Sequence, residues 1–234
     1  MLRLHLPDGV PAGIEVYRLD YQLATEPRSA DWQVLSAAEQ ARAQRFHRLE
    51  DRCRAVRTRA CLRRLLGERQ GCAPAGVRIE ADAYGKPSSP DGGVYFNVSH
   101  SGALGLIALS ALRPVGVDIE QQGDGADGDA GAGAARLAGL AALVYSPAER
   151  RTPLEGGVLA HWVAKEAVLK ALGVGLSEPL AALTVGRSMA LASGPAAAGG
   201  GAQYQLTHER PDWPPLALWP LDVERGYRAA LALA

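Results

Sequence analysis

The sequence predicts an α+β fold made of two similar halves, and three observations support that prediction. Short stretches of alternating polarity, such as residues 13–23 and 114–120, are typical of antiparallel strands with one buried face. Two long segments are rich in the helix formers Ala, Leu, Arg and Lys. Residues 58–67 and 164–173 also echo each other, because cations fall at matching places and both segments end in glycine. A helix packed on a small antiparallel sheet, present twice, accommodates these patterns.

Composition limits the kinds of protein this chain can be. It has 234 residues, of which 47% are hydrophobic and 21% charged, and its formal net charge is zero. A neutral chain lacks the basic excess of a general nucleic-acid or membrane-surface binder, and no apolar run approaches a membrane span. Three cysteines without metal-type pairing indicate reduced thiols and a cytoplasmic protein, and the N-terminal residues lack the apolar region of a signal peptide.

The first half begins with the strand at residues 13–23 and continues with two helices. Ser36 to Glu39 form a capping-box pattern that opens the first helix, and the second runs through Arg59 and ends at Gly67. Strands follow at residues 77–81, 94–99 and 103–109, the last two joined by a tight turn at residues 100–102.

Arginines crowd the helical part of this half, although the whole chain is neutral. Most of them fit solvated helix faces, yet a local basic field also suits an anionic small molecule, since the arginine fork matches phosphate oxygens. The residues concerned are Arg42, Arg45, Arg48, Arg52, Arg54, Arg57, Arg59, Arg63 and Arg64.

The second half starts with a strand over residues 114–120 that carries two acidic side chains on one face. Because side chains alternate along a strand, Asp118 and Glu120 point the same way, opposite to Val117. Two neighbouring carboxylates repel each other unless a cation lies between them. A solvated strand face is the simpler interpretation of this strand taken alone.

The stretch from Trp162 to Gly173 predicts a helix that ends at a glycine cap. Trp162, Glu166 and Lys170 fall on one side of it at spacings of four residues. A surface ion pair between Glu166 and Lys170, which would stabilise the helix by a few tenths of a kcal/mol, is enough to explain that spacing. Considered together with Asp118 and Glu120, Glu166 completes three carboxylates that can hold a hard cation such as Mg²⁺.

The remaining second-half segments are a glycine- and aspartate-rich loop at 121–134, a short helix at 135–143, and a helix start at Ser146 with proline at its first position. A second flexible insert is expected at 192–202, and strands at 216–218 and 227–233.

Five short motifs in one order resemble the 4′-phosphopantetheinyl transferases of the large, surfactin-synthetase type. A single short motif has little specificity, whereas five in one order with plausible gaps are a strong signal. The motifs are Gly85-Lys86-Pro87, Phe96-Asn97-Val98-Ser99-His100-Ser101, Gly116-Val117-Asp118-Ile119-Glu120, Tyr145-Ser146-Pro147-Ala148-Glu149 and Trp162-x-x-Lys165-Glu166-x-x-x-Lys170.

The resemblance implies a pseudo-dimer of two α+β halves, residues 1–112 and 113–234, with the active site in the cleft between them. It implies a monomeric enzyme that moves the phosphopantetheine arm of coenzyme A to a serine of an apo acyl or peptidyl carrier protein and releases adenosine 3′,5′-bisphosphate. Such an enzyme would serve polyketide or nonribosomal peptide biosynthesis.

The resemblance also assigns roles to individual residues. Mg²⁺ would be held by Asp118, Glu120 and Glu166, with Glu166 as the candidate base and Lys170 reaching the same phosphates. Coenzyme A contacts are expected, in both halves, from Arg42, Arg54, Lys86, Ser99, His100, Lys165 and Lys170. Glu39 departs from the family, which often has a basic residue at that position.

Two other functions remain open on the sequence: another Mg²⁺-dependent phosphate-ester enzyme with the same three carboxylates, and a non-catalytic module that binds coenzyme A or a carrier protein. The short, trimeric holo-carrier synthase type is disfavoured because this chain resembles two such units joined. A serine hydrolase is disfavoured because Ser99 and His100 are neighbours on a strand and there is no Gly-x-Ser-x-Gly elbow.

Overall fold

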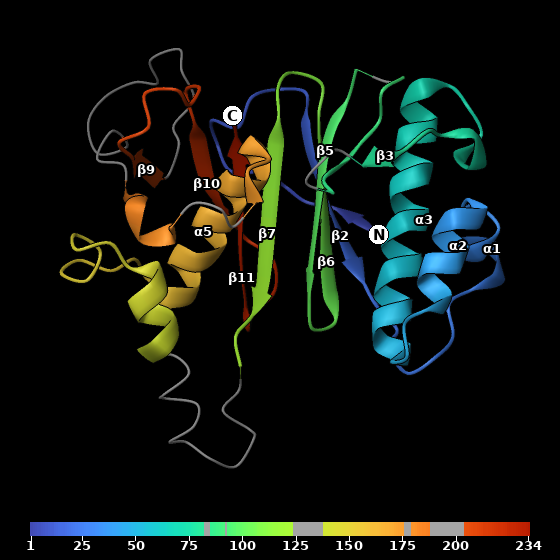
Figure 1. Ribbon diagram of the computed structural model, residues 1–234, viewed down its shortest axis with the longest axis horizontal. Coiled ribbons are helices and arrows are strands. Elements are labelled where there is room, and N and C mark those ends of the chain that lie inside the picture. Colours follow the sequence, from blue (N-terminus) through green and yellow to red (C-terminus); the bar gives the residue numbers. More distant parts are fainter. Residues whose placement is uncertain (82–84, 92, 124–137, 176–178, 188–203) are drawn as a thin grey trace.

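The chain folds into four layers in the order helix, sheet, sheet, helix (Figure 1). A computed structural model describes residues 1–81, 85–91, 93–123, 138–175, 179–187 and 204–234. Helix α3 (Leu49–Gln70) packs on the outer face of the first sheet and α5 (Gly157–Leu172) on the outer face of the second. The inner faces of the two sheets meet in one apolar core, which is the arrangement that buries both faces of each sheet.

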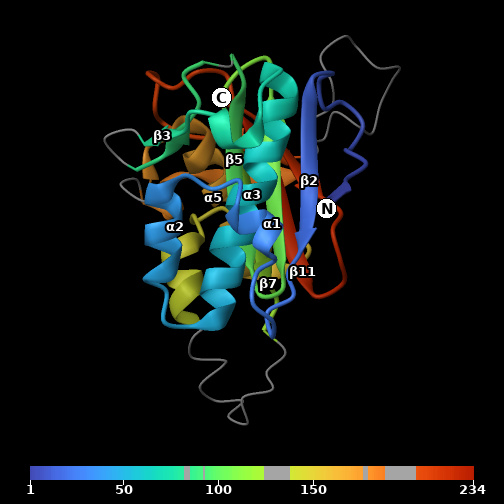
Figure 2. The same ribbon diagram turned by 90° about the vertical axis from the view of Figure 1, so that its right-hand side faces the viewer.

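The first sheet is antiparallel and has the strand order β1-β2-β6-β5. Its strands are β1 (Leu2–Arg3), β2 (Ile14–Asp20), β5 (Tyr95–Ser101) and β6 (Leu104–Ser110). Seen from the side in Figure 2, the short helices α1 (Ser29–Trp32) and α2 (Ala37–Gln44) lie beside α3. A 3₁₀ turn (Pro74–Gly76) and the small pair β3 (Glu80–Ala81) and β4 (Pro87–Ser88) follow α3.

The second sheet is also antiparallel, with the order β7-β11-β10-β9-β8. Its strands are β7 (Val115–Gln121), β8 (Thr184–Arg187), β9 (Tyr204–Thr207), β10 (Ala217–Leu221) and β11 (Tyr227–Leu233). A 3₁₀ turn (Leu180–Ala182) precedes β8.

The same strand order occurs in both sheets. In the first, α3 follows β2 and the order in space is β2-β6-β5; in the second, α5 follows β7 and the order is β7-β11-β10. In each half the last strand, β6 or β11, lies between the strand that precedes the helix and a strand that follows it. The predicted α+β class, with antiparallel sheets and a helix on each, is confirmed.

Gly116 sets how closely α5 approaches β7. A Cβ atom at this position would lie 2.0 Å from the carbonyl oxygen of Ala167 and 2.4 Å from the amide nitrogen of Ala171. The predicted alternation of β7 holds, because Val117 and Ile119 are in the inter-sheet core while Gly116 faces α5. The acidic face of β7 is thus turned toward the helix that carries Glu166.

Several sequence expectations for the elements are confirmed. Ser36 and Glu39 form both hydrogen bonds of the capping box, and α5 ends at Gly173 in the left-handed conformation. Strand β11 has the bounds predicted for it. No helix in the described parts of the chain is long and apolar enough to cross a membrane.

Three expectations are corrected. Helix α3 does not end at Gly67 but runs to Gln70 and is capped by Gly71 with φ +65°, because Gly67 is a packing position where a Cβ would lie 2.8 Å from the carbonyl oxygen of Cys72. The strand expected at 77–81 is limited to its last two residues. Ser146 and Glu149 make capping-box hydrogen bonds, but the residues directly after Ser146 form a turn and not a helix.

The predicted loop at 121–134 and the insert at 192–202 fall mainly outside the described residues, as does the start of the helix expected at 135–143. Helical structure is present over residues 138–144.

Candidate active site

The facing edges of the two sheets, β5 and β7, bring together the residues that the sequence singled out. Asp118 on β7 is 3% exposed. Its Oδ1 accepts hydrogen bonds from the Ser99 hydroxyl at 2.7 Å and from the Lys170 ammonium at 2.5 Å. Residues from both sheets and from α5 therefore meet at one carboxylate.

Glu120 lies on the same face of β7, two residues further along. Its Oε2 accepts a 2.7 Å hydrogen bond from the Ser101 hydroxyl, and the indole of Trp162 on α5 also bonds to it. Burial and the negative charge of Asp118 raise the pKa of Glu120, against the lowering effect of Ser101 and Lys170. The two carboxylates are thus close enough that the charge on one disfavours ionisation of the other.

Glu166 is brought to this place by α5. Burial and the charge of Asp118 raise the pKa of Glu166, and Lys170 lowers it in part. Its Oε1 is buried and has no hydrogen-bond partner among the described residues, and the same is true of Oδ2 of Asp118. Buried carboxylate oxygens without partners are costly unless a cation or donor takes up their charge.

These features fit a hard divalent cation. The donor set is all carboxylate oxygen, which Mg²⁺ prefers, and two of those oxygens are buried without a hydrogen bond in the described chain. Among the described residues, no three His, Cys, Asp or Glu side chains have the mutual spacing of a formed metal site. Asp118 instead uses one oxygen to bind Lys170, which balances part of the charge.

Lys170 pairs with Asp118 across the site rather than with Glu166 along its own helix. The ion pair of this ammonium group is therefore made with Asp118 and not with the residue expected from the i,i+4 spacing. Lys170 also donates to Ser99 at 3.1 Å and keeps 28% of its side chain exposed. It can reach both the carboxylates and solvent.

A second cationic group lies at the β5 side of the junction. Arg54 on α3 donates to the carbonyl oxygen of Gly102 at 2.9 Å and pairs with Asp51 at 2.9 Å. Desolvation, then the positive charges of Arg54 and Lys170, lower the pKa of His100, whose side chain stays exposed. Of the predicted coenzyme A contacts, the structure thus brings Arg54, His100, Ser99 and Lys170 near one another.

Lys165 is in a different environment from the one expected. Its side chain is 0% exposed, and its ammonium donates to the Val144 carbonyl and to Oε2 of Glu149, each at 2.6 Å. Glu149 also accepts from the backbone amide of Val185 at 2.6 Å, and His161 Nδ1 lies 3.1 Å from its Oε1. Lys165 therefore faces the core on the far side of α5 and not the carboxylates.

Both pKa values in this buried pair are lowered, and the two shifts have opposite effects on the charged forms. Burial raises the pKa of Glu149, but hydrogen bonds from His161, Lys165 and two backbone amides outweigh it and lower the pKa to about 2. Burial lowers the pKa of Lys165 more than Glu149 raises it. The carboxylate is strongly stabilised by its many donors, while burying the ammonium has a cost that offsets part of this gain.

Lys86 and Arg42 lie away from the carboxylates. Lys86 donates to the carbonyl oxygens of Lys170 and Ala171 at 2.6 and 3.2 Å, and so joins the first half to the C-terminal end of α5. Arg42 is exposed on α2, near Arg59. Glu39, the departure from the family pattern, is paired with Arg63 at 2.7 Å and Arg59 at 3.4 Å.

Sequence reasoning missed the part played by Asn97, Ser101 and Glu149. Asn97 and Ser101 belong to a motif but were given no role of their own, although the alternation Asn97, Ser99, Ser101 marks one polar face of a strand. Glu149 was assigned to a helix start. Nothing local to it shows that donors from Lys165, His161 and the backbone of Val185 would surround it.

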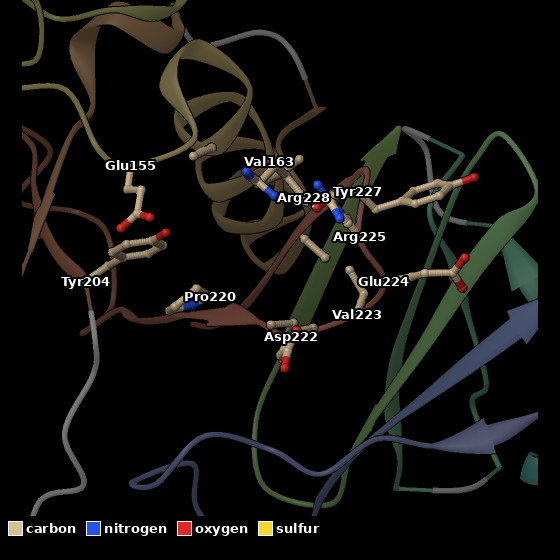
Figure 3. Close-up of a pocket in the computed structure, with 13 residues that line it drawn as sticks. Glu155, Val163, Tyr204, Pro220, Asp222, Val223, Glu224, Arg225, Tyr227 and Arg228 are labelled. Carbon is tan, nitrogen blue, oxygen red and sulfur yellow. Dashed lines mark hydrogen bonds between the residues drawn. The ribbon is translucent and has the colours of Figure 1, made fainter. Parts of the chain in front are cut away.

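A separate pocket lies away from the carboxylates. Figure 3 shows a cavity of about 290 Å³ between the start of α5 and the hairpin of β10 and β11, with Glu155 and Tyr204 at one end and Tyr227 and Glu224 at the other. None of the residues predicted for coenzyme A or metal lines it. Because its wall mixes acidic and basic side chains without a buried unpaired group, we place the candidate site at the β5–β7 junction.

Two segments of the chain match families of known proteins. Residues 114–218 match the family described as the 4′-phosphopantetheinyl transferase superfamily, and residues 25–111 match the family described as 4′-phosphopantetheinyl transferase, N-terminal. Between them the two matches contain the motifs of both sheets. The chain is thus similar to 4′-phosphopantetheinyl transferases over both matched segments.

Curated relatives point the same way. The chain is 35% identical over 156 residues to the 4′-phosphopantetheinyl transferase HetI of Nostoc sp., covering 62% of each chain. It is 34% identical to a putative 4′-phosphopantetheinyl transferase of Synechocystis sp., over 62% of this chain and 59% of the relative. It is 28% identical to the 4′-phosphopantetheinyl transferase Sfp of Bacillus subtilis, over 44% and 46%. This chain spans less than two thirds of the length of each of these relatives.

Proposed function

We propose that this protein transfers the 4′-phosphopantetheine arm of coenzyme A to a serine of an apo acyl or peptidyl carrier protein. The observation that carries the proposal is the proximity of Asp118, Glu120 and Glu166, whose charges influence one another and Lys170, with buried oxygens of Asp118 and Glu166 that have no partner in the described chain. Similarity to the family supplies the reaction class, and this arrangement supplies charges suited to a diphosphate.

The pseudo-dimer is part of the proposal. The repeated order β2-β6-β5 and β7-β11-β10, each with its own helix, supports two related halves that divide between residues 112 and 113. The site would then lie where the halves meet. Residues 1–112 would contribute Arg54, Ser99 and His100, and residues 113–234 would contribute the carboxylates and Lys170. We propose that one copy of the chain suffices as a monomer.

The carboxylates would hold one Mg²⁺ ion, which when bound neutralises charge on the pyrophosphate of coenzyme A. Lys170 adds a point charge beside that pyrophosphate, and its exposure allows it to move from Asp118 to a phosphate oxygen. Lys165 is not among the proposed phosphate contacts, because its ammonium is buried against Glu149.

The reaction is a displacement at the phosphorus next to the pantetheine arm. The carrier serine oxygen forms a bond to that phosphorus while the bond from phosphorus to the bridging oxygen breaks. The bridging oxygen leaves on adenosine 3′,5′-bisphosphate, and the serine proton passes to Glu166, the candidate base. The buried position of Glu166 on a rigid helix keeps its carboxylate oriented for that proton.

The nucleotide end of coenzyme A would lie toward β5 and α3. Arg54 and His100 are placed for the 3′-phosphate, and the exposed Arg42 can extend the cationic surface along α2. Lys86 would act from the end of α5 on which its ammonium now rests. Glu39 forms ion pairs with Arg59 and Arg63, so we do not include those two arginines among the residues that bind the 3′-phosphate.

The test is an intact-mass measurement. The protein is incubated with an apo carrier protein, coenzyme A and Mg²⁺, and the carrier is expected to gain the mass of one phosphopantetheine group. Binding of coenzyme A with no mass gain on several carriers would indicate a binding module. Release of phosphate from small esters without a carrier would indicate another Mg²⁺-dependent phosphate-ester enzyme.

A further inference from the structure

Three polar side chains of β5 bind the backbone of β7. The Asn97 side-chain oxygen accepts from the amide of Val117 at 3.0 Å, Ser99 Oγ from Ile119 at 3.4 Å, and Ser101 Oγ from Gln121 at 3.0 Å. The two residues of each pair are 20 positions apart. Successive pairs are two residues further along β5 and two residues further along β7.

This ladder satisfies the free edge of the second sheet. Successive amides of a strand point to opposite edges, and β7 pairs through its backbone with β11 on one side. On the other side its alternate amides would be an open edge, which is a site of unwanted pairing. Side chains of β5 take the place of a backbone partner there and join the two sheets edge to edge.

The two serines do more than the asparagine. Ser99 Oγ donates its proton to Asp118 at 2.7 Å, and Ser101 Oγ donates to Glu120 at 2.7 Å. A hydroxyl has one proton, so a serine that accepts from β7 must give that proton to the carboxylate. Ser99 is saturated, because it also accepts from Lys170 at 3.1 Å. One oxygen of each carboxylate is therefore held in place.

We propose that Ser99 and Ser101 are positioning residues for the metal carboxylates, and that they do so from the opposite half of the chain. Each serine fixes one oxygen of its carboxylate and the strand that carries it. For Asp118 this leaves Oδ2, the oxygen without a partner among the described residues, for the ion. The inference rests on the proposed function, and it gives Ser99 a role at the carboxylate in place of the nucleotide contact expected from the family.

The ladder also fixes the register between the halves. Because side chains alternate with period two, a shift of β5 by one residue would turn Val98 and His100 toward β7 and remove all three hydrogen bonds. Metal ligands on one half would then lose their partners on the other. The alternation of Asn97, Ser99 and Ser101 thus specifies the geometry of the site as well as the joint.

Asn97 supplies the matched control, since it is a rung of the same ladder but makes no hydrogen bond to a carboxylate in the described part of the chain. Ser99→Ala, Ser101→Ala and Asn97→Ala each remove one rung. Binding of Mn²⁺ in the presence of coenzyme A is measured by calorimetry for all three, and the free energy of unfolding is measured without metal. Ser101→Thr, which keeps the hydroxyl, serves as the rescue variant.

We expect all three alanine variants to lose stability. Mn²⁺ affinity should fall about 10- to 100-fold in the two serine variants only, as for other groups that orient metal ligands, and should return in Ser101→Thr. Equal affinities in Ser101→Ala, Ser99→Ala and Asn97→Ala would overturn the inference, as would a wild type that binds no Mn²⁺. If the wild type binds Mn²⁺ but modifies no carrier, the proposed function fails while the comparison of variants still judges the serines.

Discussion

The proposed phosphopantetheinyl transfer depends on individual carboxylate side chains. Asp118 is the most important of them, because Ser99 and Lys170 bind one of its oxygens while the other is buried without a partner in the described chain. Its charge is also a cause of the raised pKa values of Glu120 and Glu166. A change confined to that charge tests the site without altering its packing.

Asp118→Asn keeps the size of the side chain and an oxygen that can accept from Ser99 and Lys170. Loss of the negative charge should lower the initial rate of transfer to an apo carrier at least about 100-fold, the usual effect of removing one electrostatic contact in such a site. Asp91→Asn is the control, because Asp91 is exposed and its ion pair among the described residues is with Arg78, and its rate should equal that of the wild type. A fully active Asp118→Asn protein would contradict the assignment.

Lys165 should behave as a structural residue. Removing one partner of a buried ion pair leaves the other without compensation, so Lys165→Met should reduce the free energy of unfolding by about 3–5 kcal/mol. The double variant with Glu149→Gln should lose much less than the sum of the two single variants. Chemical denaturation of the four proteins measures this cycle, and strict additivity would show that the pair does not act as a unit.

Elements rather than residues explain why the carboxylates meet at all. Strand β7 lies against α5 at a distance that only Gly116 permits, and β7 also faces β5 through the side-chain ladder. Glu166 and Asp118 come from elements far apart in sequence. Their meeting depends on that one close contact.

Gly116→Ala tests this contact. The added methyl would lie 2.0 Å from the Ala167 carbonyl oxygen, which belongs to helix backbone and cannot rotate away. We expect α5 to move away from β7, with loss of transfer activity and of Mn²⁺ binding. Gly186→Ala is the matched control, because Gly186 lies in β8 of the same sheet with no atom within 4 Å of the new Cβ. Equal activity of the two variants would refute the importance of the contact.

The sequence predicted the local features of these elements and not their partners. Alternation in residues 114–120 and the capping box at Ser36 are short-range signals, and both predictions are confirmed. Gly67 misled because a glycine inside a helix for packing looks the same as a glycine that caps it. The burial of Lys165 depends on Glu149 and Val144, and the sequence near Lys165 does not predict either contact.

The whole molecule is two helix-covered sheets joined at a polar edge and an apolar inner face. The second sheet is anchored to α5 by the buried carboxylate of Glu149, which also ties down β8 and the turn at Ser146. That anchor makes global stability depend on pH in a defined range.

Glu149 has a pKa of about 2 in the folded protein, below its ordinary value of 4.5. A lowered folded pKa stabilises the fold fully above the unfolded value, and this contribution is lost as pH falls from 4.5 through about 2. The free energy of unfolding of the wild type should therefore decline over that interval. In Glu149→Gln the decline should be shallower and the protein less stable at neutral pH. Equal slopes for the two proteins, measured by denaturation at several pH values, would contradict the role of Glu149.

The central claim is that Asp118, Glu120 and Glu166 converge on one divalent ion at the joint between the sheets. Anomalous diffraction from crystals grown with coenzyme A and Mn²⁺ tests it most directly. We predict a single manganese peak within ligand distance of all three carboxylates and of the pyrophosphate. A peak elsewhere, or a pyrophosphate bound at this joint without a metal peak beside it, would contradict the account.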